Sequence, residues 1–147
     1  ITPAVLLNDY AQLAAGSNFI KPLTDATFEN CIIEGNQYVE FYVEQEGSEA
    51  VNFYLDHTAV HFESSNTAIV NNPFFDWEDN AYYNQIIRNG NPAFVLAEDN
   101  DMRITQQSDF LAKGDASVGA SIPVDLAGKT RTSPPDLGAY QHVIIED

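Results

Sequence analysis

The sequence is poor in cysteine, in basic residues and in long apolar runs, and each shortage argues against a class of structure. Cys31 is the single cysteine among 147 residues, so no disulfide can form within the chain and packing must hold the fold. Six lysine and arginine residues face 22 acidic residues, and the net charge of -16 repels nucleic acid phosphates. Apolar runs such as AVLL and CII are too short to span a bilayer. We therefore expect neither nucleic-acid binding nor a transmembrane segment.

The composition is otherwise that of a folded protein. Hydrophobic residues make up 44% of the chain and aromatic residues 12%, which at this length favours one domain with a sizeable core. The sequence begins at Ile1 instead of a methionine. We therefore expect a mature or truncated product, a fragment of a longer protein whose upstream part includes any export signal.

Runs rich in β-branched and aromatic residues recur along the chain, separated by Gly, Asn, Asp or Pro. Such runs are typical of β-strands bounded by turns, so the sequence predicts an all-β fold. The strand-like runs are ATFENCIIEGN (26–36), YVEFYVEQ (38–45), AVNFYLDHTAVHFE (50–63), NPAFVLA (91–97) and DMRITQ (101–106).

Two of these runs form a weak internal repeat. When FENCIIEG is laid over LDHTAVHF at an offset of 27 residues, Phe28 falls on Leu55 and Ile33 falls on Val60. Equivalent positions stack about 4.8 Å apart in a parallel solenoid, so these pairs predict an interior apolar column.

The same alignment places a polar pair and an earlier strand. Asn30 falls on His57, which predicts a polar rung of the stack. The strand-like AVLLND places Val5 23 residues before Phe28, so three segments recur at a spacing within the range that indicates a solenoid. We expect the Val5 segment to form one more layer of the same stack.

Residues 66–90 interrupt this pattern. The segment mixes Asn, Pro and aromatic residues without a period, which predicts a loop excursion. Its aromatic side chains either cover the side of the solenoid or line a sugar-binding surface. Carbohydrate binding is predicted at Trp77, Tyr82 and Tyr83.

The end of the chain has the residues of a terminating turn. Asp125 and Asp136 can accept hydrogen bonds from backbone N–H groups, glycines permit positive φ, and consecutive prolines deny donors to further strand pairing. Arg131 lies between the two aspartates, so we expect a buried Asp–Arg–Asp cluster that pins the last strands. Tyr140 is expected to plug the end of the core.

Four motifs follow one another along the chain: FENCIIEGN, NPAFVLAEDNDMRI, SDFLAKGDAS and VDLAGKTRTSPPDLGAYQ. The last motif contains the closing element Asp-x-x-Gly-x-x-Arg followed by Asp-x-Gly-Ala-Tyr. Its residues are Asp125, Gly128, Arg131, Asp136, Gly138, Ala139 and Tyr140. This succession resembles secreted right-handed parallel β-helix proteins of the pectate-lyase-like superfamily, particularly those of Bacteroidetes-type bacteria. The chain departs from the family where a Ser-Pro-Ala stretch becomes SDFLAKGDASVG and where Gln141 replaces an acidic residue.

The resemblance implies an extracellular or cell-surface protein with the fold of a right-handed parallel β-helix. On this interpretation the chain is its C-terminal part, with β-helix coils over residues 1–65, the excursion over 66–90, and the last strands and cap over 91–147. The closing element then has a structural role in the cap.

Two acidic clusters are candidate cation sites. Oxygen-rich loops of this kind suit Ca²⁺, but their spacing lacks the glycine and distal glutamate of an EF-hand, so a solvated acidic surface is the competing interpretation. The candidate ligands are Asp76, Glu78, Asp79, Asp99 and Asp101.

No catalytic residues are predicted. A lyase of this superfamily needs a basic residue with calcium, and a glycoside hydrolase needs converging carboxylates; neither pattern stands out. The leading hypothesis is a non-catalytic portion that binds polysaccharide or another cell-surface partner. The alternatives are the tail of a polysaccharide lyase or glycoside hydrolase whose active site lies upstream of residue 1, and an interaction module whose open coil edge pairs with upstream coils or another chain.

Overall fold

The computed structural model describes residues 2–14 and 16–146, which are mostly short strands with few helices, as predicted. Within this range no helix has the length and apolar character needed to cross a membrane. The strands are β1 (Val5–Asn8), β2 (Tyr10–Gln12), β3 (Asn18–Ile20), β4 (Thr27–Glu29), β5 (Ile32–Ile33), β6 (Phe41–Glu44), β7 (Tyr54–Asp56), β8 (Ala59–Val60), β9 (Tyr83–Asn84), β10 (Ile87–Arg88), β11 (Phe94–Leu96) and β12 (Asp101–Ile104). The helices are α1 (Thr67–Val70) and α2 (Ala116–Ser121), with 3₁₀ turns η1 (Pro73–Phe75) and η2 (Ala97–Asp99).

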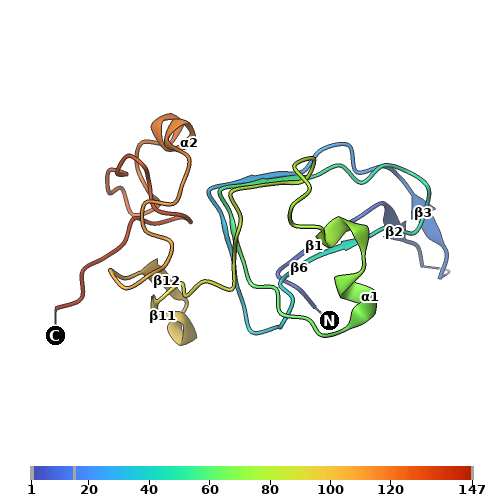
Figure 1. Ribbon diagram of the computed structural model, residues 1–147, viewed down its shortest axis with the longest axis horizontal. Helices are drawn as coiled ribbons and strands as arrows, with labels where there is room; N and C mark the ends of the chain where they lie inside the picture. The colour runs from blue at the N-terminus through green and yellow to red at the C-terminus, as the bar shows by residue number, and fades with distance from the viewer. Residues whose placement is uncertain (1, 15, 147) are drawn as a thin grey trace.

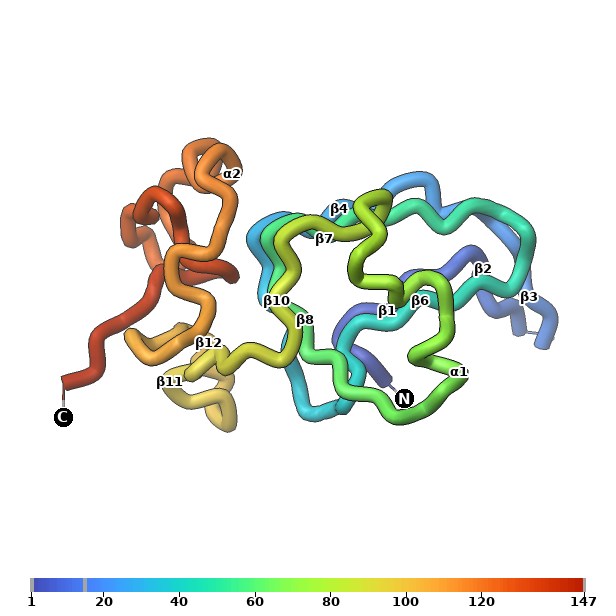
Figure 2. The backbone as a smooth tube through the Cα atoms, in the orientation of Figure 1, coloured from blue at the N-terminus to red at the C-terminus, as the bar shows by residue number. Residues whose placement is uncertain are grey.

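Two parallel three-stranded sheets, β4-β7-β9 and β5-β8-β10, form the centre of the molecule, which we call the strand stack. Three successive segments of the chain each contribute one strand to each sheet, and Figure 2 shows them nested where β8 and β10 are labelled. Phe28 pairs with Leu55 and Ile33 pairs with Val60. The predicted 27-residue alignment of these two segments is therefore confirmed.

Each segment turns from one sheet to the other at a corner with the same backbone conformation. The first corner residues are Asn30, His57 and Gln85, with φ of 53°, 44° and 51°. Asparagine tolerates this left-handed region better than most residues with a side chain. The predicted placement of Asn30 with His57 is confirmed, and Gln85 adds a third position.

In β5 and β8 successive residues point to opposite faces of the sheet and pack in different cores. Ile33 and Val60 belong to the main core, whose other members include Phe41, Phe53 and Leu55. On the other face, Ala59 belongs to a second core with Ile32 and Ile87 packed against it; that core also contains Ile104, Phe110 and Leu137.

The third segment lies inside the region predicted to be a loop. Residues 66–90 do contain α1 and η1, but β9 and β10 follow them and add to the stack. Tyr83 pairs with Leu55 at a separation of 28 residues, one more than between the first two segments. The excursion thus interrupts the repeat without ending it, and the prediction of a loop is wrong for residues 83–88.

The expected layer formed by the Val5 segment is also wrong. β1 pairs in parallel with β6, so Val5 lies opposite Phe41 instead of Phe28. A hairpin of β2 and β3 follows β1 and lengthens the chain between β1 and the stack. Buried Asp9 holds this hairpin by accepting the N–H groups of Glu46 and Gly47 at 2.8 and 2.9 Å.

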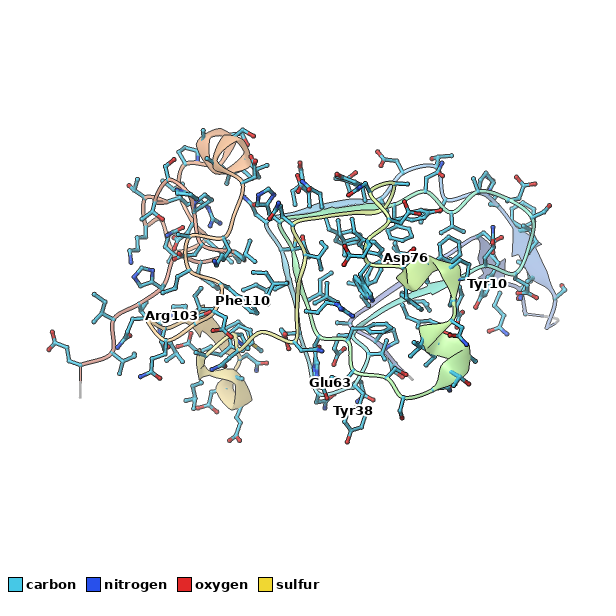
Figure 3. All side chains as sticks on the ribbon, viewed as in Figure 1. Tyr10, Tyr38, Glu63, Asp76, Arg103 and Phe110 are labelled. Atoms are coloured by element: carbon cyan, nitrogen blue, oxygen red, sulfur yellow. The ribbon has the colours of Figure 1, made fainter. Side chains whose placement is uncertain are left out.

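Residues 91–146, which we call the C-terminal unit, lie beside the corner of the strand stack (Figure 1). They contain the antiparallel hairpin β11-β12, and α2, which Asp115 caps by accepting the N–H groups of Ser117 and Val118. Figure 3 shows Phe110 on the side of this unit that faces the stack, and Arg103 farther from it. Phe110 and Leu137 are fully buried against Ala59, so the second core joins the unit to the stack.

Leu55→Ala tests the apolar column. Leu55 is fully buried between the strands of Phe28 and Tyr83, so its truncation leaves a cavity. We expect the free energy of unfolding in urea to fall by about 2–5 kcal/mol. Leu126→Ala, at a side chain that is 75% exposed, is the matched control and is expected to change it by less than about 0.5 kcal/mol. Equal effects of the two substitutions would contradict the column.

Candidate functional site

A hollow with a volume of about 1040 Å³, which we call the edge groove, is the candidate site. It lies between the strand stack and the C-terminal unit. Its lining is mostly apolar and includes Ile32 from β5, Phe94 and Met102 from the β11-β12 hairpin, and Val118 and Ile122 from α2 and its end. Both parts of the molecule therefore contribute to one concave surface.

One side of the groove is the open edge of the strand stack. β4 and β5 are the outermost strands of their sheets, and residues 29–32 line the groove. The N–H groups of Ala59 and His61 donate to the carbonyl oxygens of Cys31 and Ile33. Because backbone groups alternate in direction along a parallel strand, those of Ile32 point away from β8 and toward the open edge. This edge can accept another strand.

Asn30 connects the open edge to the C-terminal unit. Its Nδ2 donates to the carbonyl oxygen of Asp115 at 3.1 Å, and its Oδ1 accepts the Asp115 N–H at 2.6 Å. Its backbone carbonyl accepts the Gly138 N–H at 2.7 Å. Gly138 has φ of 87°, a conformation that residues with a side chain rarely adopt, so this position favours glycine.

Asp125 organises the closing loop by hydrogen bonds to the backbone. One oxygen accepts the N–H groups of Ala127 and Lys129 at 2.9 and 2.8 Å, and the other accepts the Gln141 N–H at 2.9 Å. Burial by itself raises the pKa of Asp125, but these three donors outweigh it and lower the pKa below its ordinary value. Gly128 completes the turn with φ of 80°.

Asp136 is buried and accepts the N–H groups of Ala112 and His142, both at 2.8 Å. The amide of Gln141 also donates to Asp136 at 2.9 Å, while its oxygen accepts the Asp136 N–H at 3.0 Å. A glutamate at position 141 could not donate in this way and would place a second carboxylate against Asp136. Glutamine therefore fits this buried position, which a glutamate would not.

Arg131 and Tyr140 differ from their expected roles. Arg131 donates to the carbonyl oxygens of Gly138 and Ala139 at 3.1 and 3.4 Å, and within residues 2–14 and 16–146 no ion pair joins it to Asp125 or Asp136. The expected ion cluster is therefore wrong. Asp125 binds backbone N–H groups and Asp136 pairs with His142 at 2.8 Å, while Arg131 acts on Asp125 only as a nearby charge that helps to lower its pKa.

Tyr140 does not plug the core. It is half-buried and lines the edge groove, whereas Leu137, three residues earlier, is fully buried in the second core. The apolar leucine side chain carries no hydroxyl that would need a buried partner, so it suits this interior position better than tyrosine.

Glu34 is the carboxyl group of the groove with the most perturbed environment. Burial raises its pKa, the nearby His61 lowers it and Glu40 raises it again, with a raised pKa as the result. His61 Nδ1 lies 3.7 Å from the Glu34 carboxylate. Glu40 is fully engaged, because it accepts the N–H groups of Ala4 and Gln37 at 2.8 and 2.6 Å. The environment of Glu34 therefore disfavours its charged form relative to a free glutamate, whereas both oxygens of Glu40 accept backbone N–H groups.

Cys31 and His57 are the other reactive side chains near the open edge. Burial raises the pKa of the Cys31 thiol, which disfavours the thiolate that a nucleophile requires. His57 Nδ1 lies 2.8 Å from Asp56, which also accepts from Asn84 Nδ2 at 2.8 Å. The Thr58 hydroxyl beside them donates to the carbonyl oxygens of Phe28 and Asp56. These groups are occupied with holding the corner.

The aromatic residues predicted to bind carbohydrate pack against the main core. Tyr83 is 2% exposed and its hydroxyl donates to the Phe74 carbonyl oxygen at 2.5 Å, so it offers no ring face to solvent. Tyr82 stacks on Phe53 with ring centres 4.6 Å apart. Trp77 has Arg88 5.6 Å from its ring centre. Both Trp77 and Tyr82 remain partly exposed, and their binding of sugar stays a prediction.

The predicted calcium ligands lie in the segment after η1, in η2 and at the start of β12. Asp76 and Asp79 accept the N–H groups of Glu78 and Ala81, and Asp101 forms an ion pair with Arg103 at 2.5 Å. That hydrogen-bonded pair lowers the pKa of Asp101. Asp99 is exposed in η2. In the part of the chain that the structure describes, no three Asp, Glu, His or Cys side chains gather closely enough to hold a metal ion. Calcium binding stays a prediction.

Comparison of the chain with protein-family models, curated proteins and solved structures finds no match. The resemblance to the pectate-lyase-like superfamily therefore stays a prediction that rests on the motifs quoted above.

The lowered pKa of Asp125 predicts a pH-dependent contribution to stability. This contribution is present above the unfolded-state pKa of about 3.9 and is lost as the pH falls through the lower folded-state pKa. The deficit in unfolding free energy of Asp125→Asn should therefore be largest near pH 7 and shrink in acid, as measured by urea unfolding from pH 7 to pH 2. The exposed Asp25→Asn is the control. A deficit that does not change with pH would contradict the assignment.

Proposed function

We propose that this chain is the non-catalytic terminal part of an extracellular right-handed parallel β-helix, in which the C-terminal unit closes the flank of the coils. The observation that carries the proposal is the repeated strand–corner–strand unit, with Leu55 paired to Phe28 on one side and Tyr83 on the other. Each added segment contributes one strand to each of two parallel sheets, which is how a coiled parallel fold grows.

The contacts of the C-terminal unit support a closing role. Its buried side chains meet the outward face of β5-β8-β10, and Asn30 hydrogen-bonds to its backbone at Asp115 and Gly138. Pro135 is buried and contributes no N–H that could continue a sheet. The unit therefore covers apolar sheet surface and does not add another parallel strand to it.

The environment of the reactive side chains supports a non-catalytic role. The raised pKa of Cys31 disfavours nucleophilic attack, and the Thr58 hydroxyl and Asp56 carboxylate are bound to neighbouring groups. Glycoside hydrolysis uses two carboxyl groups that face one bond. Glu34 has a raised pKa, but its neighbour Glu40 cannot serve as the second carboxyl group, because both of its oxygens accept backbone N–H groups.

Polysaccharide or cell-surface contact is the second part of the proposal, and it rests on the resemblance together with the partly exposed rings of Trp77 and Tyr82. The net charge of -16 favours a neutral polysaccharide over a polyuronate.

Substitution of Asn30 tests the closing role. Asn30→Gly keeps a residue that accepts positive φ and removes both side-chain hydrogen bonds to Asp115. We expect proteolysis within the C-terminal unit to become about tenfold faster in native buffer. Gln85→Gly is the matched control, because it changes the equivalent, exposed corner of the third segment. If the two variants are cleaved at the wild-type rate, Asn30 does not hold the unit closed.

Polysaccharide binding is tested by affinity electrophoresis in gels that contain neutral polysaccharides. Tyr82→Ala and Trp77→Ala should each weaken binding about tenfold, through the loss of a ring that stacks on sugar. Tyr38→Ala removes an aromatic side chain that is 76% exposed outside the excursion and serves as the control. Circular dichroism shows whether each variant is folded. Unchanged binding by folded Tyr82 and Trp77 variants would reject this surface.

A further inference from the structure

The position of β1 indicates what the edge groove holds. Along the first segment the chain passes from β4 through β5 to β6, and β1 pairs with β6. β1 therefore belongs to the layer of the stack that comes before the layer formed by β4, β5 and β6. In the same layer as β1, the places next to β4 and β5 hold no strand from residues 2–14 or 16–146.

The residues that lead into β1 show that the chain reaches this strand from the open edges of β4 and β5. The Ala4 N–H donates to the Glu40 side chain at 2.8 Å, and the Val5 N–H donates to the Glu40 carbonyl oxygen at 2.9 Å. Glu40 ends the connection that leads from β5 into β6. The residues that enter β1 therefore run beside the connection from β5 to β6, in the neighbouring layer of the stack.

The edge groove has the lining that an added strand requires. The outward backbone of Ile32 offers hydrogen-bonding groups, and apolar side chains such as Met102 and Ile122 stand across from it on the C-terminal unit. A strand rises about 3.3 Å per residue with alternating faces, so an extended segment can pair with the edge and bury every second side chain. A compact ligand would leave the edge unpaired.

We propose that polypeptide directly N-terminal to β1 fills the edge groove and pairs in parallel with β5 and β4. This inference rests on the proposed function, because it supplies the preceding coil of the same fold. Thr27 stands 14 positions before Phe41, and the same spacing places the added strands within about 14 residues before Val5.

The groove also defines the composition of the added segment. Glu29, Glu34 and Glu98 line it with Arg131, so the lining carries more acidic than basic side chains. We expect alternating apolar residues with neutral or basic ones between them. A second copy of the chain fits less well, because each copy carries a charge of -16 and the edge lies beside the C-terminal unit.

Amide hydrogen exchange measured by NMR tests the proposal. The 147-residue chain is compared with a chain that also carries the fifteen residues encoded before Ile1. In the longer chain the Ile32 amide should exchange about 100-fold more slowly, because it gains a backbone partner. The Val60 amide, inside the stack between β5 and β10, is the internal control and should not change.

A substitution in the groove wall distinguishes binding of the added segment in the groove from a general stabilisation of the fold. Ile122→Asp, at a groove side chain that is 55% exposed, should restore rapid exchange of Ile32 in the longer chain. Leu126→Asp, at a side chain that is 75% exposed and does not line the groove, should leave exchange slow.

Three results would overturn the proposal. They are equal Ile32 exchange in the two chains, protection of Ile32 that grows with the concentration of the 147-residue chain, and a gene that encodes no such segment. The second result would assign the groove to another copy. The Asn30→Gly test uses the 147-residue chain and involves no upstream residue. An unprotected Ile32 with accelerated proteolysis of that variant would therefore reject the groove assignment and leave the closing role intact.

Discussion

Parallel pairing of successive segments is the constraint on which the remaining structure depends. Leu55 lies between Phe28 and Tyr83, so its strand must hold the same register on both sides. That register is kept because each segment turns at a corner with positive φ, at Asn30, His57 and Gln85. In β5 and β8 the first residue of the strand packs in the second core and the next one packs in the main core.

The part of the fold that could be predicted is the part that repeats without interruption. The alignment of Phe28 with Leu55 was visible because the first two segments have similar apolar spacing. The third was hidden, since the excursion precedes it and shifts its offset to 28 residues. The partner of β1 was not predictable from spacing, because the inserted β2-β3 hairpin made the interval from Val5 to Phe28 resemble a period.

The turns at Asp125 and Gly138 could be predicted, but their long-range contacts could not. Turn-forming roles for Asp125 and Gly138 follow from residue type, because few residues accept several N–H groups or tolerate positive φ. The contact between Asn30 and Asp115 spans 85 positions, so no local pattern reveals it. The edge groove was equally hidden, since its lining comes from residues 29–36 and from residues 92–140, which are far apart in the sequence.

The setting of the open edge has a consequence for solubility. A bare edge strand is a template for aggregation, since any flat sheet can extend it. Here the open edge of β5 faces the edge groove, whose other wall is the C-terminal unit. Glu29, Glu34 and Glu98 line the same groove. A broad sheet from a misfolded neighbour meets both steric and electrostatic opposition, whereas one narrow strand can enter. The walls that select an incoming strand therefore also act as a safeguard against fibril growth.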